Sequence, residues 1–187
     1  MLKQLQHDIK GKVKDWEVKM EKVYYGSFQS PLLKEVFVAS TERGLCMVDF
    51  MTSEKAFSRE LEKCFPGEVT RNDRKNRKVI SQLKQYLKGR LKRFDCPLDL
   101  RGTPFQRKAW AELAKIPFGE TRSYKEIAEK IGHPKAFRAV GNANGSNPIP
   151  LILPCHRVIE SNGGLGGFGH GLKVKKMLLD FEKGHGI

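Results

Sequence analysis

Residues 123–142, SYKEIAEKIGHPKAFRAVGN, decide the fold of the C-terminal half of this chain. Ser123-Tyr124-Lys125-Glu126 opens a first helix, and Ile127, Ala128 and Ile131 would share its inner face. Gly132-His133-Pro134 predicts a tight turn, and small or basic residues continue a second helix over about 135–142. Helix, short glycine-containing turn and helix form a helix-turn-helix pattern. A plain helical hairpin that binds no DNA fits the same pattern.

Helices also flank this stretch. Thr103-Pro104-Phe105-Gln106 predicts a helix start, with a capping residue followed by proline in the first turn. The apolar face of that helix consists of Phe105, Ala109, Trp110, Leu113 and Ile116. A last helix is expected over 173–183, with Val174, Met177, Leu178 and Phe181 on its core face.

The first hundred residues have a different pattern. Short β-rich runs at 23–28, 36–39 and 45–50, separated by turn residues, predict an antiparallel meander. Helices are expected over 53–65 and 73–91, and residues 94–102 read as a linker. The predicted fold class is therefore a two-domain α/β (α+β) protein. Residues 1–98 form a small antiparallel sheet with helices, and residues 103–187 form a helical, winged helix-turn-helix-like domain.

The stretch Pro154-Cys155-His156-Arg157-Val158 carries the strongest chemical signal. It closes the apolar run 149–153, which we expect to be a buried strand. Cationic neighbours favour the thiolate form of a cysteine, and the thiolate is the nucleophile. Adjacent residues of a strand point to opposite faces, so Cys155 and His156 would need a water relay or a local turn to communicate. A core cysteine beside a surface His-Arg pair is the alternative.

A glycine-rich segment, 163–171, follows the cysteine. Such a loop lets backbone N–H groups approach a flat ligand closely, and it has no Gly-Lys-Ser/Thr ending of a phosphate-binding loop. Taken alone, it also fits a flexible surface loop.

The charge of the chain favours a polyanionic partner. Lys and Arg number 35 against 21 Asp and Glu, giving a net charge of +14 and a pI near 9.7. Residues 1–100 carry 21 basic and 14 acidic side chains, and residues 101–187 carry 14 and 7. No apolar run approaches the roughly 20 residues of a membrane span, and the N-terminus has no signal-peptide pattern. The four cysteines fit no zinc-binding spacing, so we expect no metal.

In order and spacing, these motifs resemble the O6-alkylguanine-DNA alkyltransferases, also called methylated-DNA–protein-cysteine methyltransferases. The matching segments are 147–150, 154–158, the glycine-rich loop and 176–182, with 123–124 and 138–141 upstream. The resemblance covers at least residues 103–182. It implies a ribonuclease H-like N-terminal domain and a DNA-binding C-terminal domain.

The resemblance also implies catalytic roles. Cys155 would accept the alkyl group, and His156 would deprotonate it through a bridging water. Glu182 would orient His156, and Asn147 would brace the active-site turn. Tyr124 would help to rotate the nucleotide out of the duplex and would hydrogen-bond the base.

Further residues are assigned to DNA and to the base pocket by the same resemblance. Arg138 would fill the gap left in the base stack, and the other residues expected at the DNA are Ser123, Tyr124, Ala136, Ala139 and Gly141. The alkyl and base pocket would be lined by Pro150, Val158, Phe168 and Gly169. Many family members carry Tyr-Ser where this chain has Phe168-Gly169, which affects the alkyl size accepted rather than the reaction.

The function implied is direct reversal of O6-alkylguanine in double-stranded DNA, in a single turnover that consumes Cys155 and needs no cofactor. O4-alkylthymine is a possible second substrate. We expect a monomer without membrane contact that acts in the cytoplasm, associated with the nucleoid, or in the nucleus of a eukaryote. Three alternatives stay open at this point: a helix-turn-helix regulator, a lesion-recognition protein without transfer, and a thiol hydrolase.

Overall fold

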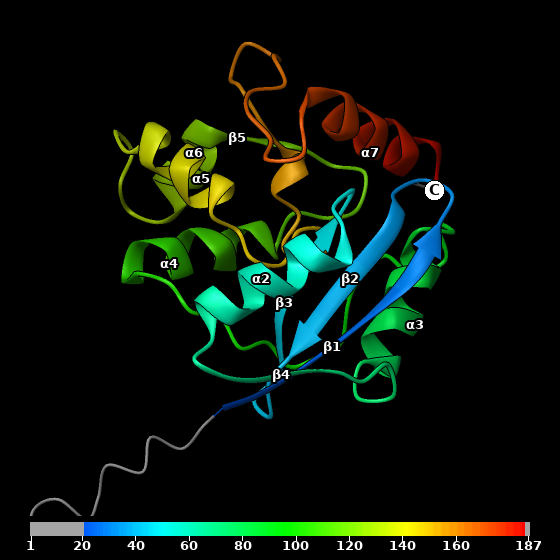
Figure 1. The fold of residues 1–187 in the computed structure, drawn as a ribbon. Helices are drawn as coiled ribbons and strands as arrows, with labels where there is room; N and C mark the ends of the chain where they lie inside the picture. The colour runs from blue at the N-terminus through cyan, green and yellow to red at the C-terminus, as the bar shows by residue number, and fades with distance from the viewer. Residues whose placement is uncertain (1–20, 186–187) are drawn as a thin grey trace, which may run out of the picture.

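The computed structural model describes residues 21–185, and its N-terminal part is built on a four-stranded sheet (Figure 1). The strands are β1 (Glu21–Ser30), β2 (Lys34–Ser40), β3 (Leu45–Phe50) and β4 (Gly67–Arg71), in the order β3-β2-β1-β4. The predicted antiparallel meander is confirmed for β1, β2 and β3. The first 20 residues of the predicted domain 1–98, and the last two of 103–187, lie outside the described residues.

The sheet differs from the predicted antiparallel arrangement at one edge. β4 pairs with β1 in parallel, from Glu21 opposite Gly67 to Tyr25 opposite Arg71. The strand GEVTR has no buried residue, so it lacks the apolar pattern that marks a strand in a sequence. Its parallel direction follows from α2, which crosses over between β3 and β4.

Two helices accompany the sheet, α2 (Glu54–Cys64) and α3 (Arg77–Tyr86). Ser53 caps α2 as predicted, its side chain accepting from Ala56 N at 3.2 Å. The second helix is shorter than the predicted 73–91. Asn76 is buried, and its side-chain amide donates to the Tyr24 carbonyl at 2.9 Å, so the residues before it form a turn against the sheet. Gly89, with φ of 71°, ends the segment.

The C-terminal part holds the predicted helix-turn-helix. Its first helices are α4 (Pro104–Leu113), α5 (Tyr124–Lys130) and α6 (Phe137–Gly145), with α6 packed on both α4 and α5. Reciprocal capping boxes begin α4, through Thr103 and Gln106, and α5, through Ser123 and Glu126. The chain ends in α7 (Leu172–Gly184). No helix within residues 21–185 is long and apolar enough to cross a membrane.

The predicted buried strand before the cysteine is wrong. Residues 149–153 form turns, with Leu151 at φ of 75°, and residues 155–157 form a single 3-10 turn. Prolines 148, 150 and 154 lack the N–H that a strand ladder needs. The segment is apolar because it is buried on all sides. Strand structure begins only afterwards, where β6 (Val158–Ile159) pairs in parallel with β5 (Arg122–Ser123).

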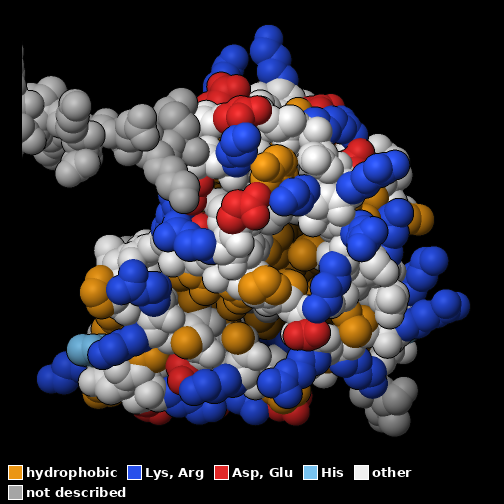
Figure 2. Space-filling view, turned by 90° about the horizontal axis from the view of Figure 1, so that it is seen from below, with side chains coloured by type: hydrophobic (Ala, Val, Ile, Leu, Met, Phe, Trp, Pro, Cys, Tyr) orange, Lys and Arg blue, Asp and Glu red, His pale blue; other side chains and the backbone are white. Residues whose placement is uncertain are grey.

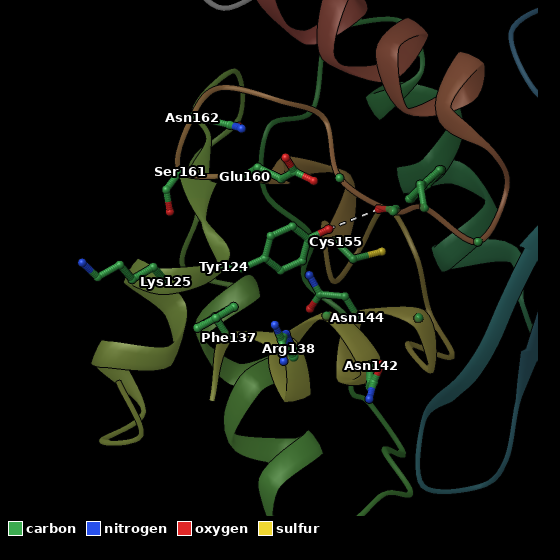
Figure 3. A pocket seen from close by; sticks show the side chains of 16 residues that line it. Tyr124, Lys125, Phe137, Arg138, Asn142, Asn144, Cys155, Glu160, Ser161 and Asn162 are labelled. Carbon is green, nitrogen blue, oxygen red and sulfur yellow. Dashed lines mark hydrogen bonds between the residues drawn. The ribbon is translucent and has the colours of Figure 1, made fainter. Parts of the chain in front are cut away.

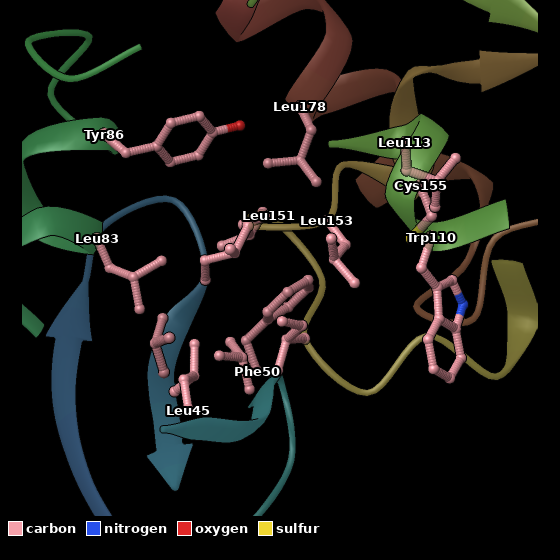
Figure 4. Close-up of a cluster of buried hydrophobic side chains, with 14 of the residues drawn as sticks. Leu45, Phe50, Leu83, Tyr86, Trp110, Leu113, Leu151, Leu153, Cys155 and Leu178 are labelled. Carbon is pink, nitrogen blue, oxygen red and sulfur yellow. The ribbon is translucent and has the colours of Figure 1, made fainter. Parts of the chain in front are cut away.

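One hydrophobic core joins the two parts of the chain. Phe50 of β3 and Leu83 of α3 belong to the same buried cluster as Trp110 of α4 and Leu178 of α7 (Figure 4). Leu151, from the turn before Cys155, also lies in this cluster. The turn that carries the cysteine is therefore fixed by elements from both halves of the sequence. The predicted two-part α/β class is confirmed.

Candidate active site

A cavity of about 830 Å³ lies between α5, α6 and the glycine-rich loop (Figure 3). Cys155 and Tyr124 both line this cavity, and Cys155 is 6% exposed. Arg138 of α6 and Phe168 and Gly169 of the loop line the same cavity. The thiol is thus shielded from bulk water but accessible to a group that enters the cavity.

Asn147 holds both the cysteine and the turn before it. Its side-chain amide donates to Leu153 O at 2.7 Å and to Cys155 Sγ at 3.2 Å, and its Oδ1 accepts from Ile149 N at 3.1 Å. Burial raises the pKa of the Cys155 thiol, while the Asn147 hydrogen bond and the charge of Lys175 act in the opposite direction. The sequence predicts that cationic neighbours favour the thiolate form of Cys155, but within residues 21–185 no side-chain hydrogen bond joins His156 or Arg157 to the sulfur. Both side chains are hydrogen-bonded to Glu182 instead.

Glu182 lies at the centre of a buried polar network. Its Oε1 is 2.8 Å from His156 Nε2 and accepts from Arg157 Nη2 at 2.8 Å and from the Tyr86 hydroxyl. Its Oε2 accepts from Arg157 Nε at 2.9 Å and from Gly119 N at 3.1 Å. Although burial alone would raise the pKa of Glu182, these donors hold it far below its usual range. The carboxylate is therefore charged at neutral pH.

His156 is fully buried, and burial lowers its pKa despite the Glu182 carboxylate beside it. The imidazole is accordingly neutral at pH 7. Nδ1 of His156 has no hydrogen-bond partner among residues 21–185. A neutral imidazole that is fixed through Nε2 by a carboxylate, with Nδ1 unengaged by protein, can accept a proton.

Lys175 is a buried cation that the sequence prediction missed. It has 0% exposure, and its Nζ donates to the carbonyls of Val158 at 2.6 Å, Gly167 at 3.2 Å and Leu165. Burial lowers the pKa of Lys175 to about 8. The side chain ties the glycine-rich loop to β6. The sequence offered one signal for this burial: the lysine directly follows Val174, which lies on the apolar face of α7.

Arg157 and Tyr86 were also missed. Arg157 stood inside the quoted motif, but nothing local showed that its guanidinium points inward. Tyr86 lies within the predicted helix 73–91, where it packs in the core and is fully buried. Its hydroxyl reaches Glu182 across 96 residues of sequence, a contact that no local pattern predicts.

The glycine-rich loop is fastened on two sides. The Tyr124 hydroxyl donates to Gly167 O at 3.2 Å (Figure 3). His170 stacks on Phe50 of β3, with ring centroids 3.9 Å apart, and its Nε2 lies 2.7 Å from Asp49 Oδ1. The loop thereby covers the cavity while anchored to α5 and to the N-terminal sheet.

The residues expected at DNA lie on or beside the helix-turn-helix. Arg138 and Ala139 are exposed on α6, and Ala136 precedes that helix as its N-cap. Gly141 faces Tyr124, because a Cβ at this position would lie 3.8 Å from the ring. Ser123 accepts from Glu126 N as the cap of α5.

Two expected pocket residues lie elsewhere. Pro150 and Val158 are buried and are not among the residues that line the cavity, although both flank the segment carrying Cys155. Within residues 21–185, no three His, Cys, Asp or Glu side chains gather in an arrangement that could hold a metal ion.

Comparison with known proteins shows which family has this architecture. Residues 104–184 match the family model of the 6-O-methylguanine DNA methyltransferase DNA-binding domain, and residues 23–100 match the ribonuclease-like domain of the same family. Proteins named methylated-DNA–protein-cysteine methyltransferase from Methanosarcina barkeri and Methanosarcina acetivorans are 43% and 45% identical. Each alignment covers 86% of this chain and 98% of the relative.

Solved structures agree with the sequence comparisons. The crystal structure of O6-methylguanine methyltransferase from Mycobacterium tuberculosis matches with a TM-score of 0.75 and 41% identity, over 87% of this chain and 94% of that one. A structure of the mycobacterial protein in complex with DNA matches with the same TM-score and coverage at 40% identity. Because both domain models match and the archaeal relatives align over nearly their whole length, this chain belongs to the 6-O-methylguanine DNA methyltransferase family.

Proposed function

We propose that this protein repairs double-stranded DNA by transferring the alkyl group of O6-alkylguanine to its own Cys155. The observation that carries the proposal is a cysteine inside a cavity that opens beside α6, followed directly in the sequence by His156, whose buried imidazole pairs with Glu182 of α7. The names of the relatives, and the mycobacterial complex with DNA, support the same reaction class.

The lesion has to leave the duplex, because the thiol lies inside a cavity. Extrusion of a nucleotide costs a few kcal/mol, and less when its pairing is already damaged. Arg138, which is exposed on α6 and lines the cavity, would fill the vacated stack. The small residues Ala136, Ala139 and Gly141 allow α6 to approach the minor groove closely, and Ser123 fixes the start of α5.

Proton transfer follows from the charge states. The raised pKa of Cys155 keeps it a thiol at rest, and neutral His156 removes its proton through a water molecule at Nδ1. Glu182 stays ionised and stabilises the imidazolium that forms. Asn147 donates to the sulfur and stabilises the developing thiolate. Lys175 adds positive charge nearby.

The transfer itself is an in-line displacement. The sulfur forms a bond to the alkyl carbon, the bond from that carbon to O6 breaks, and guanine departs with the electron pair. Burial raises the pKa of Tyr124, so its hydroxyl is protonated and able to donate to the departing base. Phe168 and Gly169 lie at the cavity wall where they would cover the base and set the alkyl size accepted. A thioether is a poor leaving group, so each molecule reacts once.

The same proposal covers the remaining assignments. We assign the N-terminal domain to residues 1–98 and the alkyltransferase domain to residues 103–187, acting as a monomer without a cofactor in the cytoplasm. O4-alkylthymine in DNA is a second substrate to be tested beside O6-alkylguanine.

Intact-protein mass spectrometry tests the function. Incubation with duplex DNA that contains O6-methylguanine should add one methylene mass in a stoichiometric amount, and Cys155→Ala should gain none. Tight binding to the lesion without a mass gain would mean a recognition or regulatory protein. Repeated turnover on a small ester would mean a thiol hydrolase.

A further inference from the structure

The reaction proposed above uses no Lys or Arg of the N-terminal half. Residues 1–100 carry 21 Lys and Arg against 14 Asp and Glu, yet α5, α6 and Cys155 all lie after residue 103. The excess is concentrated at α3 and the turn that follows it. Residues 74–93 contain nine Lys and Arg and no Asp or Glu. A run of this kind is a strong local source of positive potential.

Four of these cations line one groove. Arg77 and Lys84 lie on one face of α3, and Lys88 and Arg90 follow in the next turn. Together they line a groove of about 610 Å³ beside the C-terminal end of β1. All four side chains are exposed, and none forms an ion pair with another residue in 21–185. Positive charge that is not neutralised within the protein is available to an external anion.

Two neighbouring cations outside the groove are neutralised within the protein. Lys75 pairs with Glu42 at 3.2 Å, and Lys78 pairs with Asp95 at 3.1 Å. The acidic side chain in the groove is Asp73, whose Oδ1 accepts from Ser27 N at 3.2 Å and whose Oδ2 lies 3.9 Å from Arg71. Its charge is offset locally, so the groove keeps a net positive charge.

The lining of the groove suits phosphate groups. Guanidinium and ammonium groups bind phosphate oxygens through charge-assisted hydrogen bonds. The polar side chains of Ser27, Ser81 and Gln85 line the same groove between the cations. A row of cations separated by small polar groups fits successive phosphates of a nucleic-acid backbone better than it fits one compact anion.

The groove lies on the opposite side of the molecule from the helix-turn-helix. In Figure 1, α3 lies at one side of the molecule, whereas α5 and α6 lie at the other, with the sheet and α2 between them. Figure 2 shows Lys and Arg side chains gathered along the right-hand side, on which α3 lies in Figure 1. A duplex bound at α6 would therefore not reach the groove without sharp bending.

We propose that the groove formed by Arg77, Lys84, Lys88 and Arg90 binds the phosphate backbone of a second duplex DNA segment. The inference rests on the proposed function, which supplies DNA as the polyanion. A protein with two separate DNA surfaces holds two duplex segments at once. It can then pass from one segment to another without full release, which shortens the search for a rare lesion.

A charge-neutralising triple variant tests this surface. Lys84→Gln, Lys88→Gln and Arg90→Gln remove three groove cations. The matched control removes three other exposed cations that make no ion pair within residues 21–185, by Lys55→Gln, Arg59→Gln and Lys183→Gln. Two short duplexes, one with a donor dye and one with an acceptor dye, report bridging by energy transfer. The wild type and the control should bridge them, and the groove variant should not.

Salt dependence gives an independent readout. Three lost phosphate contacts should reduce the slope of log K against log salt for a long duplex by about 3, since each contact contributes about 0.9. Methyl transfer to one short duplex should be unchanged in the groove variant, which separates this proposal from the proposed function. Bridging and a salt slope equal to those of the control would overturn the proposal. So would loss of heparin or RNA binding in the groove variant with bridging unchanged.

Discussion

Replacing Glu182 by Gln keeps the size of the side chain but removes the charge at the centre of the buried network. The wild-type carboxylate accepts two hydrogen bonds from Arg157, one from the Tyr86 hydroxyl and one from His156. An amide at this position would leave the guanidinium of Arg157, which is 4% exposed, without its counter-ion. Breaking a buried ion pair by removing one partner costs about 3–5 kcal/mol.

For a chain of this length, 1 kcal/mol corresponds to about 2–4 °C in Tm, so Glu182→Gln should melt about 6–20 °C below the wild type. Thermal denaturation followed by circular dichroism measures this difference. Tyr86→Phe is the control, because it keeps the charge pair and leaves one acceptor position on Glu182 unfilled. It should cost about 1–3 kcal/mol. A melting temperature of Glu182→Gln at or above that of Tyr86→Phe would refute the reasoning.

The pH dependence of the difference in stability between wild type and Glu182→Gln provides a second test. The folded-state pKa of Glu182 lies below its unfolded value of about 4.3, so its stabilisation is complete above that pH and decreases as the pH falls towards the folded pKa. The contribution of the Glu182 charge to the gap in stability between wild type and Glu182→Gln should therefore shrink as the pH falls below 4. A gap that stays unchanged down to pH 3 would contradict the assigned charge state.

The alkyl-transfer rate should fall with the same substitution, because the carboxylate orients His156 and stabilises its protonated form. General-base catalysis contributes about 10²–10⁴-fold, and most of that contribution should be lost. Quenched single-turnover kinetics on an O6-methylguanine duplex, measured below the melting temperature of the variant, give the rate. A rate within twofold of the wild type would remove Glu182 from the mechanism.

Three further changes have defined outcomes. Asn147→Ala removes the donor to Cys155 Sγ, so the thiol pKa rises further and the pH profile of the single-turnover rate should move to higher pH. An unmoved profile would contradict this role. His170→Ala releases the loop from Asp49, and the rate on an O6-benzyl lesion should increase relative to that on an O6-methyl lesion, whereas an unchanged ratio argues against a lid that limits size. Lys175 loses its proton near pH 8 in the native state, whereas an unfolded chain releases this proton near pH 10.4. As the pH rises from 8 to 10.4, the stability of the wild type should therefore increase relative to that of Lys175→Met. Urea denaturation at pH 7.5 and pH 10 measures the gain, and equal differences at both pH values would contradict it.

Local signals in the sequence determined much of this protein. The capping residues Thr103 and Ser123 mark where α4 and α5 begin, because a cap acts within one helical turn. Short β-rich runs separated by turn residues located the three antiparallel strands, since both signals lie within a few residues of the chain. The order of the motifs around Cys155 identified the family before any contact was known. Each of these signals depends on residues close together in the chain.

The tertiary structure decided what depends on distant neighbours. The apolar run before Cys155 fits a buried strand and a buried turn equally well by hydrophobicity, and packing against both halves of the chain selects the turn. β4 forms a strand because it pairs with the free edge of β1, although the residues of β4 are mostly polar. Tyr86 meets Glu182 across 96 residues, and that contact belongs to the network that turns Arg157 inward. Buried polar groups must find partners wherever the fold places them, so the charge states that set the reactivity of Cys155 could be known only from the folded chain.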